Sequence, residues 1–232
     1  MYSENSFDFD MLVIENDEMC YLNFLLQPIY DPINLDVIHF EVLSEVYFDF
    51  EGDQTKDDFF LSCSNEFIKE VSLKQIEFFG GWNIGKVFFV NIRLSCMADD
   101  YFVEMLMKRS HLGYSIEINE FDCEIDNNIL LNFGRLQKKG VMLSLDDYHL
   151  NYKEACFSLG LIKWDYIKVD KKFIDYHVET PIVIKTLINM LSKFCKKGVI
   201  LEGIETCFHL NSVRCLGALS QGFYIYPPAR WD

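Results

Sequence analysis

The chain has 232 residues and a formal net charge of −15, and half of its residues are hydrophobic. This composition excludes a disordered polypeptide, and the length allows one domain with a substantial core. The negative charge argues against direct nucleic-acid binding, because phosphate contacts need a basic patch.

The N-terminal residues 1–20 are expected to be poorly ordered or peripheral, and residues 21–232 are expected to form a single domain. The first dozen residues are polar and acidic, without the basic and apolar regions of a signal peptide. No uncharged apolar stretch is long enough to form a membrane helix. The sequence therefore predicts a soluble, cytoplasmic protein without a membrane partner.

The 8 cysteines are scattered along the chain, with no CxxC pair and no histidine at a metal-ligand spacing. In a cytoplasmic protein of this size, such cysteines are small core residues or free thiols. We therefore expect neither a disulfide framework nor a structural zinc site.

Short apolar runs alternate with segments of helical periodicity along the chain. An early run at residues 21–30 predicts an extra strand joined to the next one by a turn. The further predicted strands are residues 37–43, 86–93, 114–119, 141–147, 166–170, 199–203 and 216–222. Helical patterns cover residues 57–79, 127–139 and 181–197, with Gly198 expected as the C-terminal cap of the third. Alternating strands and helices predict a parallel sheet.

Polar side chains stand at the ends of these strands, one strand after another. Because side chains alternate faces along a strand, Glu41 shares its face with Val37 and His39, as the last member of an inward-facing series. One such residue alone would be explained by a turn or a helix cap, but the whole set is not. Oxygen ligands at the carboxyl ends of parallel strands suit Mg²⁺, Mn²⁺ or Ca²⁺, and a βα barrel collects such ends at one mouth. The residues are Glu41, Asn91, Glu117, Asp146, Asp147, Lys168, Glu202 and Gln221.

The ordered set of motifs resembles that of the EAL domain, the family of bacterial cyclic di-GMP phosphodiesterases. The resemblance extends from about Gln27 to Pro228 and implies a TIM-like (βα) barrel whose first strand is irregular or antiparallel. The matching motifs are Gln27-Pro28-Ile29, Glu41-Val42-Leu43, Val90-Asn91-Ile92, Glu117-Ile118-Asn119-Glu120, Asp146-Asp147, Lys168-Val169-Asp170, Glu202-Gly203-Ile204-Glu205 and Gln221-Gly222-Phe223.

The resemblance also implies a role for each motif residue. It implies two divalent ions, Mg²⁺ or Mn²⁺, with Ca²⁺ as an inhibitory surrogate. The implied ligands are Glu41, Asn91, Glu117 and Asp146 for one ion, and Asp146, Asp147 and Glu202 for the other. The implied catalytic residues are Glu41, Lys168 and Glu205, with Lys168 orienting the attacking water. The implied substrate-binding residues are Gln27, Gln221 and Glu120, of which Glu120 would also anchor the loop after the paired aspartates.

Two departures from the family pattern concern the handling of substrate. The loop after the aspartates normally carries two glycines, which this chain replaces with His149 and Asn151 on either side of Leu150. Glycine permits positive φ angles and close backbone approach, so the loop is expected to follow a different path. Glu45 stands where the family often has an arginine that contacts a ligand phosphate. A carboxylate at that point would repel the phosphate that the arginine attracts.

Three functions are compatible with these residues. The first is a degenerate EAL protein with little or no phosphodiesterase activity that regulates by binding a protein, as in enteric anti-activators of the flagellar master transcription regulator. The second is an active metal-dependent phosphodiesterase that opens cyclic di-GMP to pGpG. The third is a non-catalytic cyclic di-GMP receptor. The altered loop favours the first, and its effect on the usual dimer contact favours a monomer.

Overall fold

The computed structural model describes residues 9–15, 18–48, 56–82, 85–149 and 151–230. The strands are β1 Met11–Glu15, β2 Glu18–Tyr30, β3 Val37–Phe48, β4 Phe88–Arg93, β5 Tyr114–Glu120, β6 Met142–Tyr148, β7 Trp164–Val169, β8 Cys195–Leu201 and β9 Leu219–Ser220. The helices are α1 Lys56–Ser62, α2 Asn65–Gly80, α3 Asp100–Lys108, α4 Asn127–Lys138, α5 Lys153–Ser158, α6 Lys171–His177, α7 Pro181–Leu191 and α8 Cys207–Val213. None of the helices in these ranges has the length and apolar character needed to cross a membrane.

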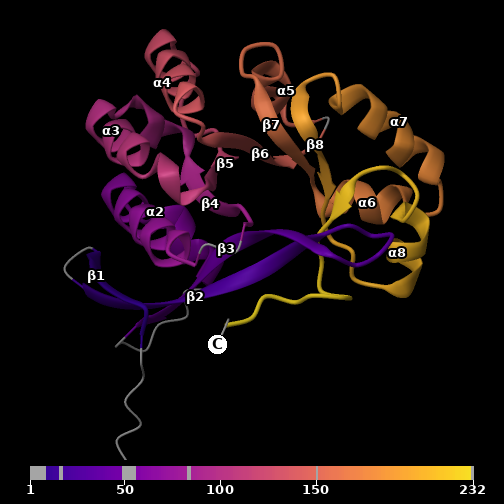
Figure 1. Ribbon diagram of the computed structural model, residues 1–232, viewed down its shortest axis with the longest axis horizontal. Coiled ribbons are helices and arrows are strands. Elements are labelled where there is room, and N and C mark those ends of the chain that lie inside the picture. The colour runs from indigo at the N-terminus through magenta and orange to yellow at the C-terminus, as the bar shows by residue number, and fades with distance from the viewer. Residues whose placement is uncertain (1–8, 16–17, 49–55, 83–84, 150, 231–232) are drawn as a thin grey trace, which may run out of the picture.

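The strands β2 to β9 form a closed barrel with the helices outside it (Figure 1). Strand β2 is antiparallel to β3, each later strand is parallel to its predecessor, and Tyr30 pairs with Ser220 to close the ring. The structure thus confirms the predicted TIM-like barrel with an antiparallel first strand.

Several sequence expectations differ from the observed elements, two of them as follows. The helix expected over residues 181–197 ends at Leu191, and Cys195 already pairs with Trp164 at the start of β8. Pairing with β7 therefore overrides the helical pattern of the last residues, and Gly198 lies within a strand. At the N-terminus, β1 pairs with β2 from Met11 onward, so the expected domain boundary at residue 21 falls inside β2. Residues 1–8 lie outside the described residues.

The barrel interior holds its own small core beneath the polar strand ends. Ile29, Phe89, Tyr166 and Ile200 form a cluster separate from the large core between the sheet and the helices. His39 hydrogen-bonds the Tyr166 hydroxyl at 2.8 Å. Phe89, Tyr166 and His39 each precede a predicted site residue by two positions, which confirms the inward alternation of these strands.

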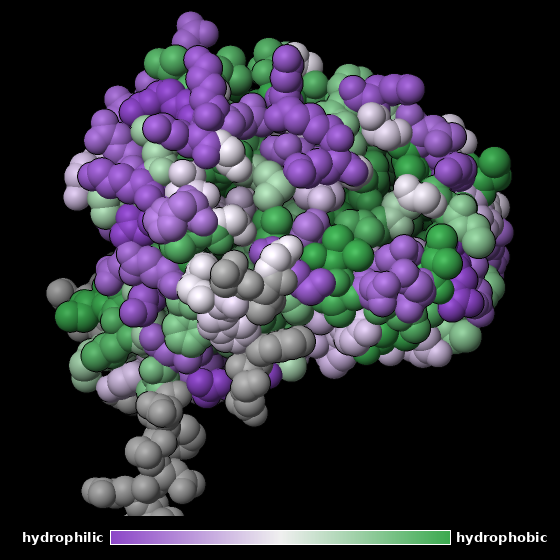
Figure 2. Space-filling view, viewed as in Figure 1, coloured by the Kyte–Doolittle hydropathy of each residue, from purple (hydrophilic) through white to green (hydrophobic). Residues whose placement is uncertain are grey.

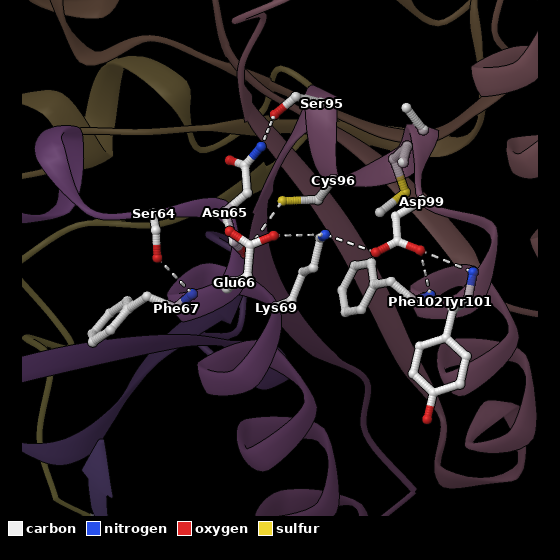
Figure 3. A network of polar contacts seen from close by, with 12 residues as sticks. Ser64, Asn65, Glu66, Phe67, Lys69, Ser95, Cys96, Asp99, Tyr101 and Phe102 are labelled. Carbon is white, nitrogen blue, oxygen red and sulfur yellow. Dashed lines mark hydrogen bonds and ion pairs between the residues drawn. The ribbon is translucent and has the colours of Figure 1, made fainter. Parts of the chain in front are cut away.

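A polar network fixes the starts of α2 and α3 against each other (Figure 3). The Ser64 hydroxyl caps α2 by accepting from the amide of Phe67, so the segment predicted as one helix over residues 57–79 is divided into α1 and α2. Asp99 caps α3 by accepting from the amides of Tyr101 and Phe102. Lys69 of α2 donates to Asp99 at 2.7 Å, so one carboxylate serves both a helix end and an inter-helix ion pair.

Replacing Asp99 with alanine should therefore destabilise the protein by about 1 to 2 kcal/mol, since a lost N-cap alone costs about 1 kcal/mol. Asp99→Asn retains a capping oxygen and should lose less. Urea unfolding monitored by circular dichroism measures both variants. Equal stability of Asp99→Ala and the wild type would show that the cap does not stabilise α3.

Candidate active site

The side chain of Lys168, at the end of β7, lies at the centre of the barrel mouth. It is 1% exposed, and its Nζ lies 2.9 Å from Glu41, 2.8 Å from Glu117, 3.1 Å from Asp146 and 2.7 Å from Glu202. A buried ammonium is tolerated only when it is paired, and here β3, β5, β6 and the residue after β8 supply its partners. The polar strand ends predicted from the sequence thus converge on one point.

Glu41 has the most hydrogen bonds of the four carboxylates. Besides Lys168, it accepts from Asn91 Nδ2 at 2.9 Å and from Gln221 Nε2 at 2.6 Å. Gln27 is buried and pairs with Glu41 across strands β2 and β3. Gln221 itself is positioned by its neighbour Gly222, where a Cβ would approach the backbone of Ile204 to 2.3 Å.

Burial and the surrounding charges give these acids different pKa values. Burial raises the pKa of Glu41, but Lys168 and the donors Asn91 and Gln221 outweigh it, so the net pKa is lowered. Burial raises the pKa of Glu117 and Glu202 well above normal, and Lys168 only partly offsets it. Burial, again partly offset by Lys168, raises the pKa of Asp146 to about 6. The pKa of each acid is thus set by the balance between burial, which favours the neutral form, and Lys168 and its neighbouring donors, which favour the charged form.

The arrangement fits divalent metal ions. Oxygen atoms of Glu41, Glu117 and Asp146 lie within 4.8 Å of one another, and so do those of Asp146, Asp147 and Glu202. Among the described residues, the buried atoms Asn91 Oδ1 and Glu117 Oε2 accept no hydrogen bond. Unpaired buried oxygens next to carboxylates suit a hard cation such as Mg²⁺ or Mn²⁺.

The loop after β6 is held by aromatic side chains. Asp147 has a φ of 49°, which is unusual for a residue other than glycine. The ring of His149 stacks on that of Tyr152, with centroids 5.7 Å apart. The Tyr152 hydroxyl accepts from the amide of Phe121 at 3.2 Å, which ties the loop to the end of β5. Leu150 lies outside the described residues.

Comparison with models of known protein families assigns the chain to one family. The family model of the EAL domain matches residues 13–228. The chain belongs to the EAL domain family. No curated protein matches the sequence.

Several solved EAL structures share the fold of this EAL domain. An EAL domain protein from Listeria monocytogenes EGD-e is 22% identical with a TM-score of 0.69, covering 89% of this chain and 88% of that one. BlrP1 of Klebsiella pneumoniae, in complex with manganese and cyclic di-GMP, is 21% identical with a TM-score of 0.73, covering 89% of this chain and 56% of that one. The EAL-like domain protein YdiV is 18% identical with a TM-score of 0.71, covering 90% and 93%. At these identities the likeness establishes the fold alone.

Two residues that the EAL resemblance places in the site have other partners in the structure. Glu120 forms an ion pair with Arg93 Nε at 2.8 Å. The guanidinium of Arg93 also donates to the carbonyls of Phe60 and Cys63, so Glu120 helps to hold the end of α1. Glu205 is exposed and pairs with Lys171 at the start of α6. No contact found among the described residues joins either glutamate to Lys168.

The sequence did not identify Arg93 as the partner of Glu120 or Tyr152 as the residue that ties the loop to β5. Arg93 follows Asn91 by two positions on the same strand, which is a signal for a side chain on the face of the site. Tyr152 carried no such signal, because its contact with Phe121 depends on the path of the loop.

Replacing Lys168 with methionine should destabilise the protein by about 3 to 5 kcal/mol at neutral pH, because it leaves buried carboxylates uncompensated. Where the pKa of a buried carboxyl group is raised, the folded protein loses stability as the pH rises. The destabilisation caused by Lys168→Met should therefore be smaller at about pH 5, where these carboxyl groups bind protons. Urea unfolding at the two pH values measures the difference. Lys171→Met, which breaks only the exposed pair with Glu205, is the control and should cost less than about 1 kcal/mol. A pH-independent loss in Lys168→Met would contradict the electrostatic cause.

Proposed function

We propose that this EAL domain is a degenerate, regulatory member of its family, with little or no phosphodiesterase activity, that acts by binding another protein. The observation that carries the proposal is the loop after Asp147. Its glycines are replaced, Tyr152 fixes its path, and its expected anchor Glu120 pairs with Arg93 instead. The side chain that the resemblance assigns to anchoring this loop is thereby committed to Arg93.

The negative charge of Glu45, near the end of β3, supports the same proposal. Glu45 lies four residues beyond Glu41 on β3 and accepts a hydrogen bond from the Tyr47 hydroxyl at 2.8 Å. Since side chains alternate, Glu45 projects from the same face of the strand as Glu41. A carboxylate there repels the phosphates of a cyclic dinucleotide, whereas an arginine would attract them.

The proposed partner is a protein, for example a subunit of the flagellar master transcription regulator, through which the chain would control motility. The likeness to YdiV, described as an EAL-like domain protein, is consistent with a divergent member of the family. Direct binding to nucleic acid is not part of the proposal.

The retained carboxylates favour a second candidate, a phosphodiesterase that converts cyclic di-GMP to pGpG. Glu41, Asn91, Glu117 and Asp146 would hold one ion, and Asp146, Asp147 and Glu202 the other. When bound, two divalent ions would activate a water and stabilise the leaving oxygen of the phosphodiester. Lys168 would orient the water, and Gln27 and Gln221 would line the pocket around it. BlrP1 is in complex with cyclic di-GMP and either manganese or calcium, which supports binding of both groups at this fold.

Hydrolysis of cyclic di-GMP by the purified protein with Mg²⁺ or Mn²⁺ tests the proposal, and we expect little or no pGpG. Calorimetry in the presence of Ca²⁺ measures the binding of cyclic di-GMP without turnover. A pull-down with the purified flagellar regulator measures partner binding. Rapid turnover that Glu41→Ala abolishes would reject the regulatory function. Tight binding without turnover would indicate the receptor instead.

If the altered loop and Glu45 cause the loss of activity, then His149→Gly, Asn151→Gly and Glu45→Arg together should raise hydrolysis. The glycines restore backbone freedom and the arginine restores attraction to phosphate. We expect a gain of at least about tenfold, equal to about 1.4 kcal/mol of transition-state stabilisation. The same triple variant with Glu41→Ala is the control. No gain in the triple variant would place the defect elsewhere in the barrel.

A further inference from the structure

A hollow lies between the segment after β5 and α5, beside the loop that follows the paired aspartates. Its volume is about 470 Å³, which is room for several side chains of a partner. Figure 2, viewed as Figure 1, shows hydrophobic and hydrophilic residues side by side at the upper edge of the molecule, where α4 and α5 lie. The residues that line the hollow are Phe121, Asp122, Cys123, Glu124 and Ile125 after β5, and Glu154 and Phe157 of α5.

The apolar part of the lining is held by the loop after β6. The ring of Phe121 packs edge-on against that of Tyr152, with centroids 5.6 Å apart, and its amide donates to the Tyr152 hydroxyl at 3.2 Å. Phe157 lines the hollow from α5, yet it is 68% exposed. A large apolar side chain left in solvent beside a formed hollow is typical of an interaction site.

The charged part of the lining is entirely acidic. Three of the seven lining residues are carboxylates and none is basic, since Lys153 of α5 is not part of the lining. Glu124 and Glu154 are exposed, and neither side chain forms an ion pair or hydrogen bond within the part of the chain that the structure describes. No lysine or arginine occurs in the sequence between Arg109 and Arg135. The hollow therefore presents uncompensated negative charge.

The remaining carboxylates near the hollow also keep their charge. Asp122 accepts from the amide of Ser95 at 2.9 Å and from its hydroxyl, and Asp126 accepts from the amide of Ile129 at 2.8 Å. These donors are neutral, so they orient the carboxylates without compensating them. Burial raises the pKa of the Cys123 thiol, and the carboxylates of Asp122 and Asp126 raise it further. A cation that enters the hollow is therefore stabilised by the charges around it.

We propose that this hollow binds an arginine of a partner protein together with a neighbouring apolar side chain. The guanidinium would stack on the ring of Phe157 and pair with the carboxylates of Glu124 and Glu154, and the apolar side chain would contact Ile125. Arginine suits this lining better than lysine, because its planar group both stacks on aromatic rings and pairs with carboxylates through parallel hydrogen bonds.

A second copy of this chain is a poorer occupant than a cationic partner. Each copy carries a net charge of −15, so two copies repel each other, whereas a basic partner is attracted. The basic segment Lys193–Lys197 is the part of a second copy that matches the hollow in charge. Its insertion would be a head-to-tail contact, which leads to rings or filaments.

The inference rests on the proposed function, because it names the chemistry of the partner that a regulatory EAL domain would bind. The probe is a short fluorescein-labelled peptide with an arginine on either side of a leucine. In two further peptides citrulline or lysine replaces each arginine, and citrulline keeps the shape while it removes the charge. Fluorescence anisotropy with the whole protein should show binding of the arginine peptide, weakened by salt. The citrulline peptide should bind at least about tenfold more weakly, and the lysine peptide should lie between them.

Two variants remove the two parts of the lining. The double variant Glu124→Gln, Glu154→Gln removes the unpaired carboxylates, and Phe157→Ser removes the exposed ring. Each should weaken binding of the arginine peptide at least about tenfold, as expected for anchors of an interface.

Matched controls separate this effect from the overall acidity of the chain. Glu70→Gln with Glu179→Gln removes two exposed carboxylates from other places, on α2 and after α6. Phe208→Ser removes a phenylalanine of α8 that is 54% exposed. Both controls should bind the arginine peptide as the wild type does, and thermal melts confirm that every variant is folded.

Equal affinity for the arginine peptide and either of the other two, or equal weakening in the hollow variants and their controls, would overturn the inference. So would sedimentation showing a wild-type dimer that Phe157→Ser dissociates, because a second copy would then occupy the hollow. Turnover of cyclic di-GMP is read separately in the same samples. Rapid turnover together with hollow-dependent peptide binding would reject the regulatory function alone. Absence of both turnover and hollow-dependent binding would reject the hollow alone.

Discussion

The rest of the barrel mouth depends on one buried ammonium group. Lys168 is enclosed by Glu41, Glu117 and Asp146, which lie on three different strands, and by Glu202, which directly follows β8. Desolvating any of these charges costs several kcal/mol, and only their mutual attraction offsets that cost. The strands must therefore end at matched heights, because a one-residue slip in any of them would turn its carboxylate away from the lysine.

Because of this constraint, the retention of the metal ligands is not in itself evidence for catalysis. The carboxylates that would bind divalent ions are the same groups that compensate Lys168. Losing one of them would leave a buried charge poorly paired, whether or not the protein hydrolyses anything. Stability alone is therefore a sufficient reason for the chain to keep them. Residues that do not contact Lys168, such as Glu45, His149 and Glu120, carry more information about catalysis.

The residues were sufficient to predict the barrel and the convergence of the strand-end residues, whereas the irregular or antiparallel first strand was implied by the resemblance to the EAL family. Alternation along buried strands is a local property, and parallel strands bring their carboxyl ends together by topology. Ion-pair partners are not local: Glu120 and Glu205 stand in motifs, yet each pairs with a cation brought near by the fold, Arg93 and Lys171. The end of α7 was placed too late for a similar reason, since pairing with β7 decides where β8 begins.

Net charge became informative only when its distribution over the fold was known. A charge of −15 describes the whole molecule, but a partner at the surface responds mainly to charges within about 8 Å at physiological ionic strength. Several of the acids are buried at the mouth around Lys168 and contribute little to the outer field. No acidic residue occurs between Glu179 and Glu202, whereas Asp170, Asp175 and Glu179 lie on or next to α6. Net charge alone therefore does not describe the field that a partner meets at a given point of the surface, because recognition depends on the local charges.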